Sequence, residues 1–435
     1  MEKIEKTGKM DRNKDLPLAI MILIMGFLFW ELSGELDVGV TIFTALLCAV
    51  SIWYLHSKGY VMNKRALACL ALLVIFSLPF FIFDSSVITA LNFIFIIGVY
   101  IYWICLYTNK AADVKLSVYM VGDALSQLIL VPFSNFGKVF SAFVKGKKTS
   151  NFGVIMLSLL AMIPLVAIVM ALLISSDVIF ESIMDSVISK VFSNISEYLL
   201  KILMGIPVAM YIYGLLYGNS TLARDDKKFK SLEYQKELSG KFQVLPKASA
   251  ATVLTVLNVI YLVYFVTQLA YFTSAFNSIL PEGFTYAEYA RRGFFQICQI
   301  SVINLFVIGI ISSFAKNSKD RLVRVEIAIL AFFTIMFSVT VISKMMLYIK
   351  IYGMTQLRVY TTWFTVVLII IFTIILIRQF VRFNAFKAAV IGFIICFAVL
   401  CYGNIDKNIA QYNLQRYEAG TLQQMDETVL PVKNL

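Results

Sequence analysis

Long apolar runs recur along almost the whole chain, and they constrain its fold more than any other feature. Apolar residues make up 60% of the 435 positions and charged residues only 15%, a composition outside the range of soluble globular proteins. A run of roughly 17 to 25 apolar residues can cross a membrane as a helix, because a helix satisfies its backbone hydrogen bonds within one segment. We place such runs at 16–34, 38–56, 66–83, 87–107, 152–175, 198–218, 249–272, 294–315, 326–349, 359–378 and 388–403.

These runs predict an all-α fold: a polytopic transmembrane helix bundle of about 11 spans, forming a single integral membrane domain over residues 1–435. With the N-terminus inside, 28 of the 38 lysines and arginines fall in inner segments, as the positive-inside rule requires. Residues 1–15 are then a basic cytoplasmic N-terminus before a retained first helix, and residues 404–435 are an extracytoplasmic C-terminal segment. The net charge of +12 is spread over many loops and forms no single basic face, so nucleic acid is not an expected partner.

Four connections are longer than turns. The stretch 116–148 has apolar residues three and four apart, a break at Pro132 and late lysines, which predicts an interfacial helix on the inner leaflet. That helix is either regulatory or a scaffold packed under the bundle. The stretch 176–197 predicts an amphipathic helix on the outer surface, 219–249 a mobile cytoplasmic loop open to partner docking, and 273–293 an outer loop.

The sequence lacks the residues that common catalytic sites need. No Asp or Glu falls in the middle of a predicted span, and no GxSxG, HExxH or P-loop pattern occurs. The six cysteines all lie inside apolar runs without a CxxC pair, and the single histidine, His56, ends such a run. We therefore expect no enzyme, no metal site and no cofactor. Pro164 and Pro207, near the middles of two spans, are either simple kinks or the broken helices of a transporter.

The candidate site is the charged stretch Leu280 to Asn304, where two adjacent arginines lie on the predicted outer side. Lys344 and Arg358 lie near the outer ends of the next two spans, which short connections make neighbours. One interpretation pairs these cations with nearby acids and is purely structural. The other is a pocket for an anionic ligand, such as a membrane lipid phosphate or an envelope precursor, with Gln299 and Asn304 below it. The residues assigned to this ligand site are Glu288, Arg291, Arg292, Gln296, Lys344 and Arg358.

Three stretches also resemble a known family. They are PEGFTYAEYARRGFFQ, YGMTQLRVYTTWF (Tyr352 to Phe364) and NIDKNIAQYNLQRYEAG (Asn404 to Gly420). In order and spacing they are similar to motifs of bacterial polytopic membrane proteins in the domain-of-unknown-function families numbered 4153 and 4173, over roughly residues 60 to 420. The resemblance implies a multi-pass protein of the bacterial cytoplasmic membrane and supplies no catalytic residue. The tail after the last motif is shorter than the family pattern.

We therefore expect a non-enzymatic sensor, immunity or accessory protein of the cell envelope. The alternative is a transporter or lipid translocase. A continuous polar path at the midplane between facing helices would favour transport, whereas a sealed apolar bundle with an outer polar bowl would favour ligand capture.

Overall fold

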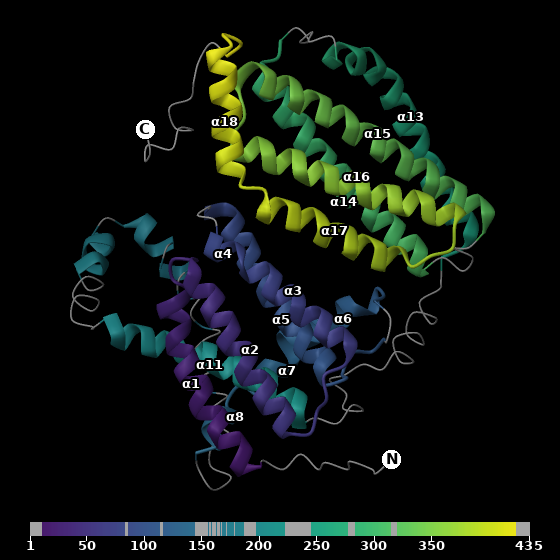
Figure 1. Cartoon of the computed structure of the whole chain (residues 1–435). Coiled ribbons are helices and arrows are strands. Elements are labelled where there is room, and N and C mark those ends of the chain that lie inside the picture. The colour runs from purple at the N-terminus through teal and green to yellow at the C-terminus, as the bar shows by residue number, and fades with distance from the viewer. Residues whose placement is uncertain are drawn as a thin grey trace. The chain divides into compact units, whose positions relative to one another are not determined.

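The regular elements of the computed structural model are helices throughout the residues it describes, which are 11–82, 86–113, 116–143, parts of 155–186, 197–221, 245–276, 283–314 and 320–422. Ten of these helices are long and apolar enough to cross a membrane. The all-α polytopic bundle is thus confirmed, and the chain is a multi-pass membrane protein. The chain divides into two compact units, Met1–Leu232 and Glu233–Leu435, which are described separately below (Figure 1). The single integral domain over 1–435 stays a prediction.

Unit 1 contains five of the ten candidate spans: α1 (Arg12–Ser33), α2 (Val38–Ser57), α3 (Lys64–Ser77) with its continuation α4 (Pro79–Ile82), α5 (Ser86–Tyr107) and α11 (Glu197–Thr221). Helices α1 and α11 pack most closely at Gly26 and Gly205. A Cβ atom on Gly26 would lie 2.3 Å from the Gly205 carbonyl oxygen, so the two backbones approach as only glycines permit. At one end of these helices, the buried Asp15 carboxylate pairs with Lys58 (2.6 Å) and accepts a hydrogen bond from the Tyr54 hydroxyl (3.0 Å).

The predicted interfacial helix 116–148 is not one continuous helix. The described part consists of α6 (Tyr119–Leu125), the π-helical turn η1 (Ser126–Leu130), α7 (Val131–Ser134) and α8 (Lys138–Ser141). Pro132 does not end the helical run, because the backbone stays helical from α6 through η1 into α7; the π-helical turn η1 directly precedes α7, which contains this proline. The break comes at residues 135–137 instead. Segment α6–α8 packs on α11 through the buried Gln127, whose side-chain amide exchanges hydrogen bonds with that of Asn219 (2.7 and 3.1 Å).

Two further predicted segments lie largely outside the described residues. In 152–175 and 176–197, those residues that the structure does describe are helical, apart from Asp177, whose side chain accepts hydrogen bonds from the N–H groups of Ile179 and Phe180. The predicted cytoplasmic loop 219–249 begins later than expected, because α11 continues to Thr221 and Asn219 is buried. Residues 222–244 of that loop are outside the described part of the chain.

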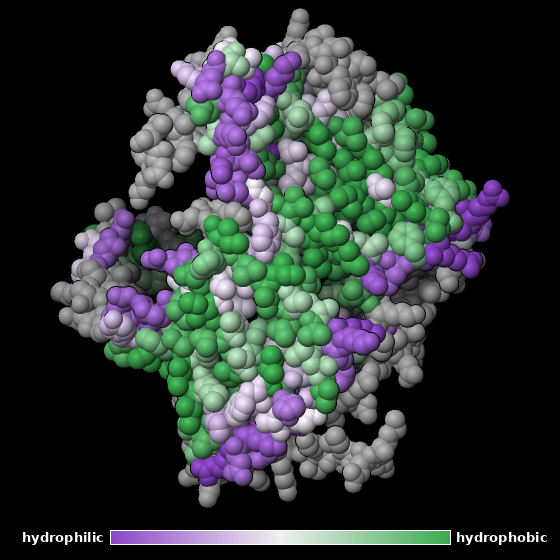
Figure 2. Space-filling view, viewed as in Figure 1, coloured by the Kyte–Doolittle hydropathy of each residue, from purple (hydrophilic) through white to green (hydrophobic). Residues whose placement is uncertain are grey.

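Unit 2 contains α13 (Lys247–Phe276), α14 (Tyr286–Phe314), α15 (Arg321–Tyr352), α16 (Gln356–Phe380), α17 (Ala385–Tyr402) and the polar helix α18 (Ile405–Glu418). The start of α13 lies beside the start of α15, where Lys247 pairs with Asp320 (2.7 Å), and beside the end of α14, where the Leu245 N–H donates to the Phe314 carbonyl (2.9 Å). Helix α14 is therefore antiparallel to both neighbours. Figure 2 shows hydrophilic residues gathered over α18, whereas the adjacent surface of unit 2 is largely hydrophobic.

The predicted outer loop 273–293 is shorter than expected. Helix α13 continues to Phe276 and α14 already begins at Tyr286, so residues 286–293 are helical and not part of a loop. The start of α14 is set by Thr285, whose hydroxyl accepts a hydrogen bond from the N–H of Glu288 (3.2 Å), and by the acidic Glu288 in the first turn. Residues 277–282 lie outside the described part.

Candidate functional site

The three motif stretches meet at one end of unit 2, which we call the motif end. The rings of Tyr286 at the start of α14 and Tyr352 at the end of α15 lie 6.4 Å apart in an edge-to-face contact. Next to them, a small buried cluster joins all three stretches. Its members are Ala290, Met345 and Ile349, with Tyr348, Met354 and Tyr412 packed against them. Stretches that lie 56 and 40 positions apart in the sequence thus form one local structure.

The side chain of Asn413 on α18 forms two hydrogen bonds with the backbone of the motif end. The Asn413 side chain accepts from the Met354 N–H (2.7 Å) and donates to the Met354 carbonyl (2.8 Å). Gly353, the residue before it, has φ of 80°, and a Cβ atom there would lie 2.8 Å from the Asn413 side-chain oxygen. The turn between α15 and α16 therefore needs glycine both for its backbone conformation and for the approach of Asn413.

Glu288 and Arg292 form the ion pair that their spacing predicts, with 2.6 Å between Oε1 and Nη2. The Arg292 guanidinium also lies 5.4 Å from the centre of the Phe284 ring. The pair is solvent-accessible, and such pairs contribute only about 0 to 1 kcal/mol to stability. Arg291 is exposed and forms no ion pair or hydrogen bond with any residue that the structure describes.

Arg358 binds the C-terminal end of α15. Its guanidinium donates hydrogen bonds to the carbonyl oxygens of Tyr352 (3.0 Å) and Gly353 and stacks 4.0 Å from the centre of the Tyr348 ring. These carbonyls end α15 and have no partner within the helix, so a cation there is favourable. Both hydrogen bonds come from Nη1, whereas Nε and Nη2 form no hydrogen bond with a described residue, so the assignment of Arg358 to the ligand site stays a prediction.

Lys344 is different from the arginines, because it is buried and lacks an acidic partner. Its residue is 7% exposed and lies eight positions before the end of α15, roughly 12 Å along the helix axis. The Nζ atom is 4.4 Å from the centre of the Tyr289 ring, and it forms no ion pair or hydrogen bond with another described residue. Gly293 on α14 leaves room for the side chain, since a Cβ atom there would lie 3.2 Å from Lys344 Cδ.

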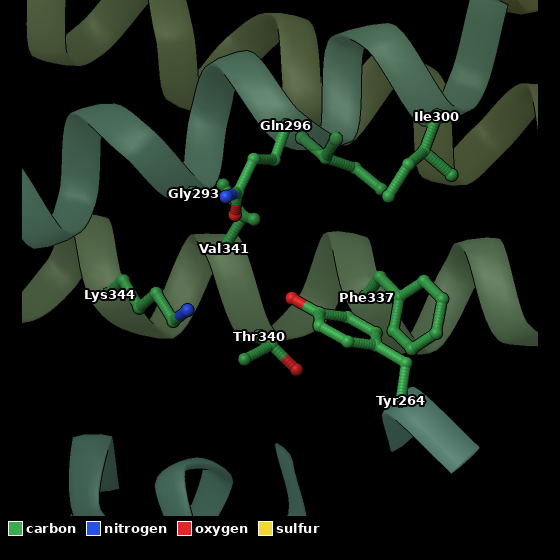
Figure 3. Close-up of a pocket in the computed structure, with 9 residues that line it drawn as sticks. Tyr264, Gly293, Gln296, Ile300, Phe337, Thr340, Val341 and Lys344 are labelled. Carbon is green, nitrogen blue, oxygen red and sulfur yellow. The ribbon is translucent and has the colours of Figure 1, made fainter. Parts of the chain in front are cut away.

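The Lys344 ammonium group lines a cavity of about 20 Å³ between α13, α14 and α15 (Figure 3). In that view the ammonium and the Tyr264 hydroxyl point toward the same space, and the Gln296 side chain reaches down from α14. The cavity is lined by Tyr264, Gly293, Gln296, Ile297, Ile300, Phe337, Thr340, Val341 and Lys344. Of the six predicted site residues, it brings together Gln296 and Lys344. Glu288, Arg291, Arg292 and Arg358 are not among its lining residues.

The prediction missed Tyr264 and Thr340 at this cavity. Tyr264 lies on α13, and nothing in its local sequence indicates which ring of an aromatic helix will face Lys344. The prediction did place Asn304 below the site. In the structure this buried residue accepts a hydrogen bond from the Tyr261 hydroxyl (2.8 Å) and donates one to the Thr334 hydroxyl (2.8 Å), which joins the middles of α13, α14 and α15.

Comparison with known proteins supports the resemblance of the three motifs. The family model described as domain of unknown function (DUF4153) matches residues 70–428, which include all three motif stretches. The chain belongs to this family. No curated protein and no solved structure matches the chain. The DUF4153 family is one of unknown function and assigns no activity to the cavity residues. Within the described part of the chain, no three His, Cys, Asp or Glu side chains are grouped so that they could hold a metal ion.

Proposed function

We propose that this DUF4153 protein is a non-enzymatic protein of the bacterial cytoplasmic membrane that binds an anionic ligand at the motif end of unit 2. The lysine and arginine distribution supports an outward-facing position for that end. Ligand binding there would serve a sensor, immunity or accessory role in the cell envelope. The observation that carries the proposal is the buried ammonium of Lys344, which lines a cavity and has no acidic partner among the described residues.

An isolated charge within a membrane span is costly, and this cost supports a ligand at Lys344. An ionised group there is expensive unless it is paired, and such groups mark ligand or ion sites. In the described spans, several acids do have basic partners within ion-pair distance: Asp15 with Lys58, Glu31 and Glu197 with Lys201, and Glu288 with Arg292. Lys344 departs from this pattern. An anionic ligand would supply the missing countercharge.

A transporter or lipid translocase is the second candidate, and a specific observation favours it. The hydrogen-bonded Tyr261, Asn304 and Thr334 place polar groups in the middle of unit 2, where a translocation path would need them. Against open passage, Asn304 and Thr334 are fully buried and bonded to each other. The arrangement therefore supports ligand capture more directly than transport.

Lys344→Met tests the proposal, because methionine keeps the volume of the apolar stem and removes the charge. We expect the variant to fold with nearly unchanged yield and to lose at least tenfold in affinity for anionic ligands, measured by native mass spectrometry of the detergent-purified protein with phosphatidylglycerol. Arg291→Met is the matched control, since it removes an exposed charge from the same end. Equal loss in both variants would mean diffuse surface attraction and would contradict the proposal.

Reconstituted vesicles distinguish the second candidate. If anion or lipid movement across the bilayer requires both Lys344 and Asn304, transport is the function. If Lys344→Met abolishes binding while wild-type vesicles show no movement above protein-free vesicles, ligand capture is the function.

A further inference from the structure

We infer that the cavity selects a small monovalent anion, held by the Lys344 ammonium and by hydrogen bonds donated from Tyr264 and Gln296. This inference rests on the proposed function, because it specifies the ligand of the same site. It concerns chemistry that a free halide or nitrate ion and the single charge of a lipid phosphodiester share, and the experiment below separates these sources.

First, the cavity contains hydrogen-bond donors that no described residue accepts from. Apart from Thr340, whose hydroxyl donates to the Met336 carbonyl, the polar groups that line the cavity come from three helices: Tyr264 from α13, Gln296 from α14 and Lys344 from α15 (Figure 3). Neither the Tyr264 hydroxyl nor the Gln296 amide forms a hydrogen bond with a described residue, and the same holds for the Lys344 ammonium. Phenol, amide and ammonium groups all donate hydrogen bonds. A bound anion would accept hydrogen bonds from all three groups. In a packed apolar core without a ligand, the same groups would stay without the hydrogen bonds that buried polar groups normally have.

The second argument is size. The cavity offers about 20 Å³, and a single water needs about 10–15 Å³ measured in the same way. The space therefore suits one compact ion. A bulkier ligand can place no more than one small charged group inside, with the remainder outside past Gln296, whose side chain is exposed.

The third argument is charge. Lys344 is the one cation among the nine lining residues, and none of them is acidic. The nearby Arg292 is already neutralised by Glu288. A monovalent anion would balance the ammonium, whereas a dianion such as sulfate would leave a net negative charge within the span, which is unfavourable.

The floor of the cavity explains why the ion would stay at the motif end. The Phe337 ring lies in edge-to-face contact with Tyr264 (centroids 5.1 Å apart) and with Tyr261 (5.6 Å). It thus separates the cavity from the Tyr261–Asn304–Thr334 hydrogen bonds. In this conformation an anion bound to Lys344 has no direct contact with the polar middle of the unit.

The experiment uses the full-length protein, purified in a neutral detergent with gluconate as the background anion. Thermal unfolding is followed while chloride, nitrate or sulfate is added at constant ionic strength. A ligand that binds the folded state raises the unfolding temperature with concentration. We expect chloride or nitrate to stabilise the wild type and sulfate to have no effect. Tyr264→Phe, which removes only the hydroxyl, should raise the half-maximal concentration about tenfold, and Lys344→Met should abolish the effect.

Tyr417→Phe, at an exposed position on α18, is the control and should behave like the wild type. A parallel titration with phosphatidylglycerol in mixed micelles identifies the source, because a lipid that uses the cavity must compete with chloride. Equal stabilisation by sulfate, or an unchanged response of Tyr264→Phe, overturns the inference while a Lys344-dependent effect still supports the proposed function. Phosphatidylglycerol binding that needs Lys344, without any change in unfolding temperature on addition of the small ions, likewise overturns the inference and still supports the proposed function. No response of the wild type to any of these anions overturns both.

Discussion

Gly293 determines how the Lys344 side chain can lie against α14. A Cβ atom at this position would be 3.2 Å from Lys344 Cδ and 3.9 Å from its Nζ, so Gly293→Ala forces the lysine stem to shift by a few tenths of an ångström. We expect a severalfold weaker anion response in thermal unfolding, because the ammonium loses its alignment with Tyr264. Gly309→Ala on the same helix is the matched control: a Cβ there meets nothing within 4 Å, and alanine should stabilise the helix by up to about 1 kcal/mol. Indistinguishable anion responses in the two variants would show that the close approach at Gly293 is unimportant.

Part of this site could be predicted from single residues and part could not. The Glu288–Arg292 pair followed from a spacing of four residues on one helix. Arg358 was assigned to the ligand site from its position alone. In the structure it donates hydrogen bonds to carbonyl groups that lack helical partners because α15 ends at Gly353. Tyr264 contributes through tertiary packing, which no local pattern encodes. Sequence thus identified Lys344 and Gln296, whereas the third donor at the cavity, Tyr264, required the structure.

At the level of helices, Asn413 supplies two of the hydrogen bonds that attach α18 next to the turn between α15 and α16, beside those of Asp406 with Gln356 and of Arg416 with the Ile349 carbonyl. Asn413→Ala removes both hydrogen bonds to Met354 and leaves that backbone N–H without its partner, at a cost of roughly 1–3 kcal/mol to docking of the helix. Hydrogen–deuterium exchange should then be faster in α18 and unchanged in α3. Gln411→Ala, at an exposed position of the same helix, should leave exchange as in the wild type. Slow exchange in α18 of the Asn413 variant would mean that the remaining contacts, among them the hydrogen bond between Gln356 and Asp406, are enough to hold the helix.

The helices themselves were predictable because lipid demands long apolar segments, but their ends were not. The span predicted at 326–349 belongs to α15, which continues from Arg321 to Tyr352. Its start is fixed by Asp320, whose side chain accepts from the Leu322 N–H, and its end by Gly353. Hydropathy marks the part of a helix that lies in hydrocarbon, whereas capping residues decide where the helix begins and ends.

At the scale of the whole chain, the contacts within unit 1 determine whether the chain crosses the membrane an odd or an even number of times between α5 and α11. Thr108, just after α5, donates a hydrogen bond to Asn219 near the end of α11 (3.3 Å), so these two helices end on the same side of the unit. The start of α11 is on the opposite side, because Lys201 pairs with Glu31 at the end of α1 (2.8 Å). A chain that leaves α5 on one side and enters α11 on the other must cross an odd number of times between them.

This parity supports the predicted span 152–175, which lies largely outside the described residues, and with it a total of 11 spans. Single cysteines at three exposed positions test it in intact cells with a membrane-impermeant maleimide: Glu35→Cys, Lys64→Cys and Asp185→Cys. We expect Asp185→Cys to react like Glu35→Cys, without permeabilisation, and Lys64→Cys to react only afterwards; wild-type protein reports the background of the native cysteines. The comparison holds whichever way the N-terminus faces, since it asks only which positions share a side. If Asp185→Cys instead reacts like Lys64→Cys, the chain does not cross between α5 and Asp185, and the predicted span 152–175 fails.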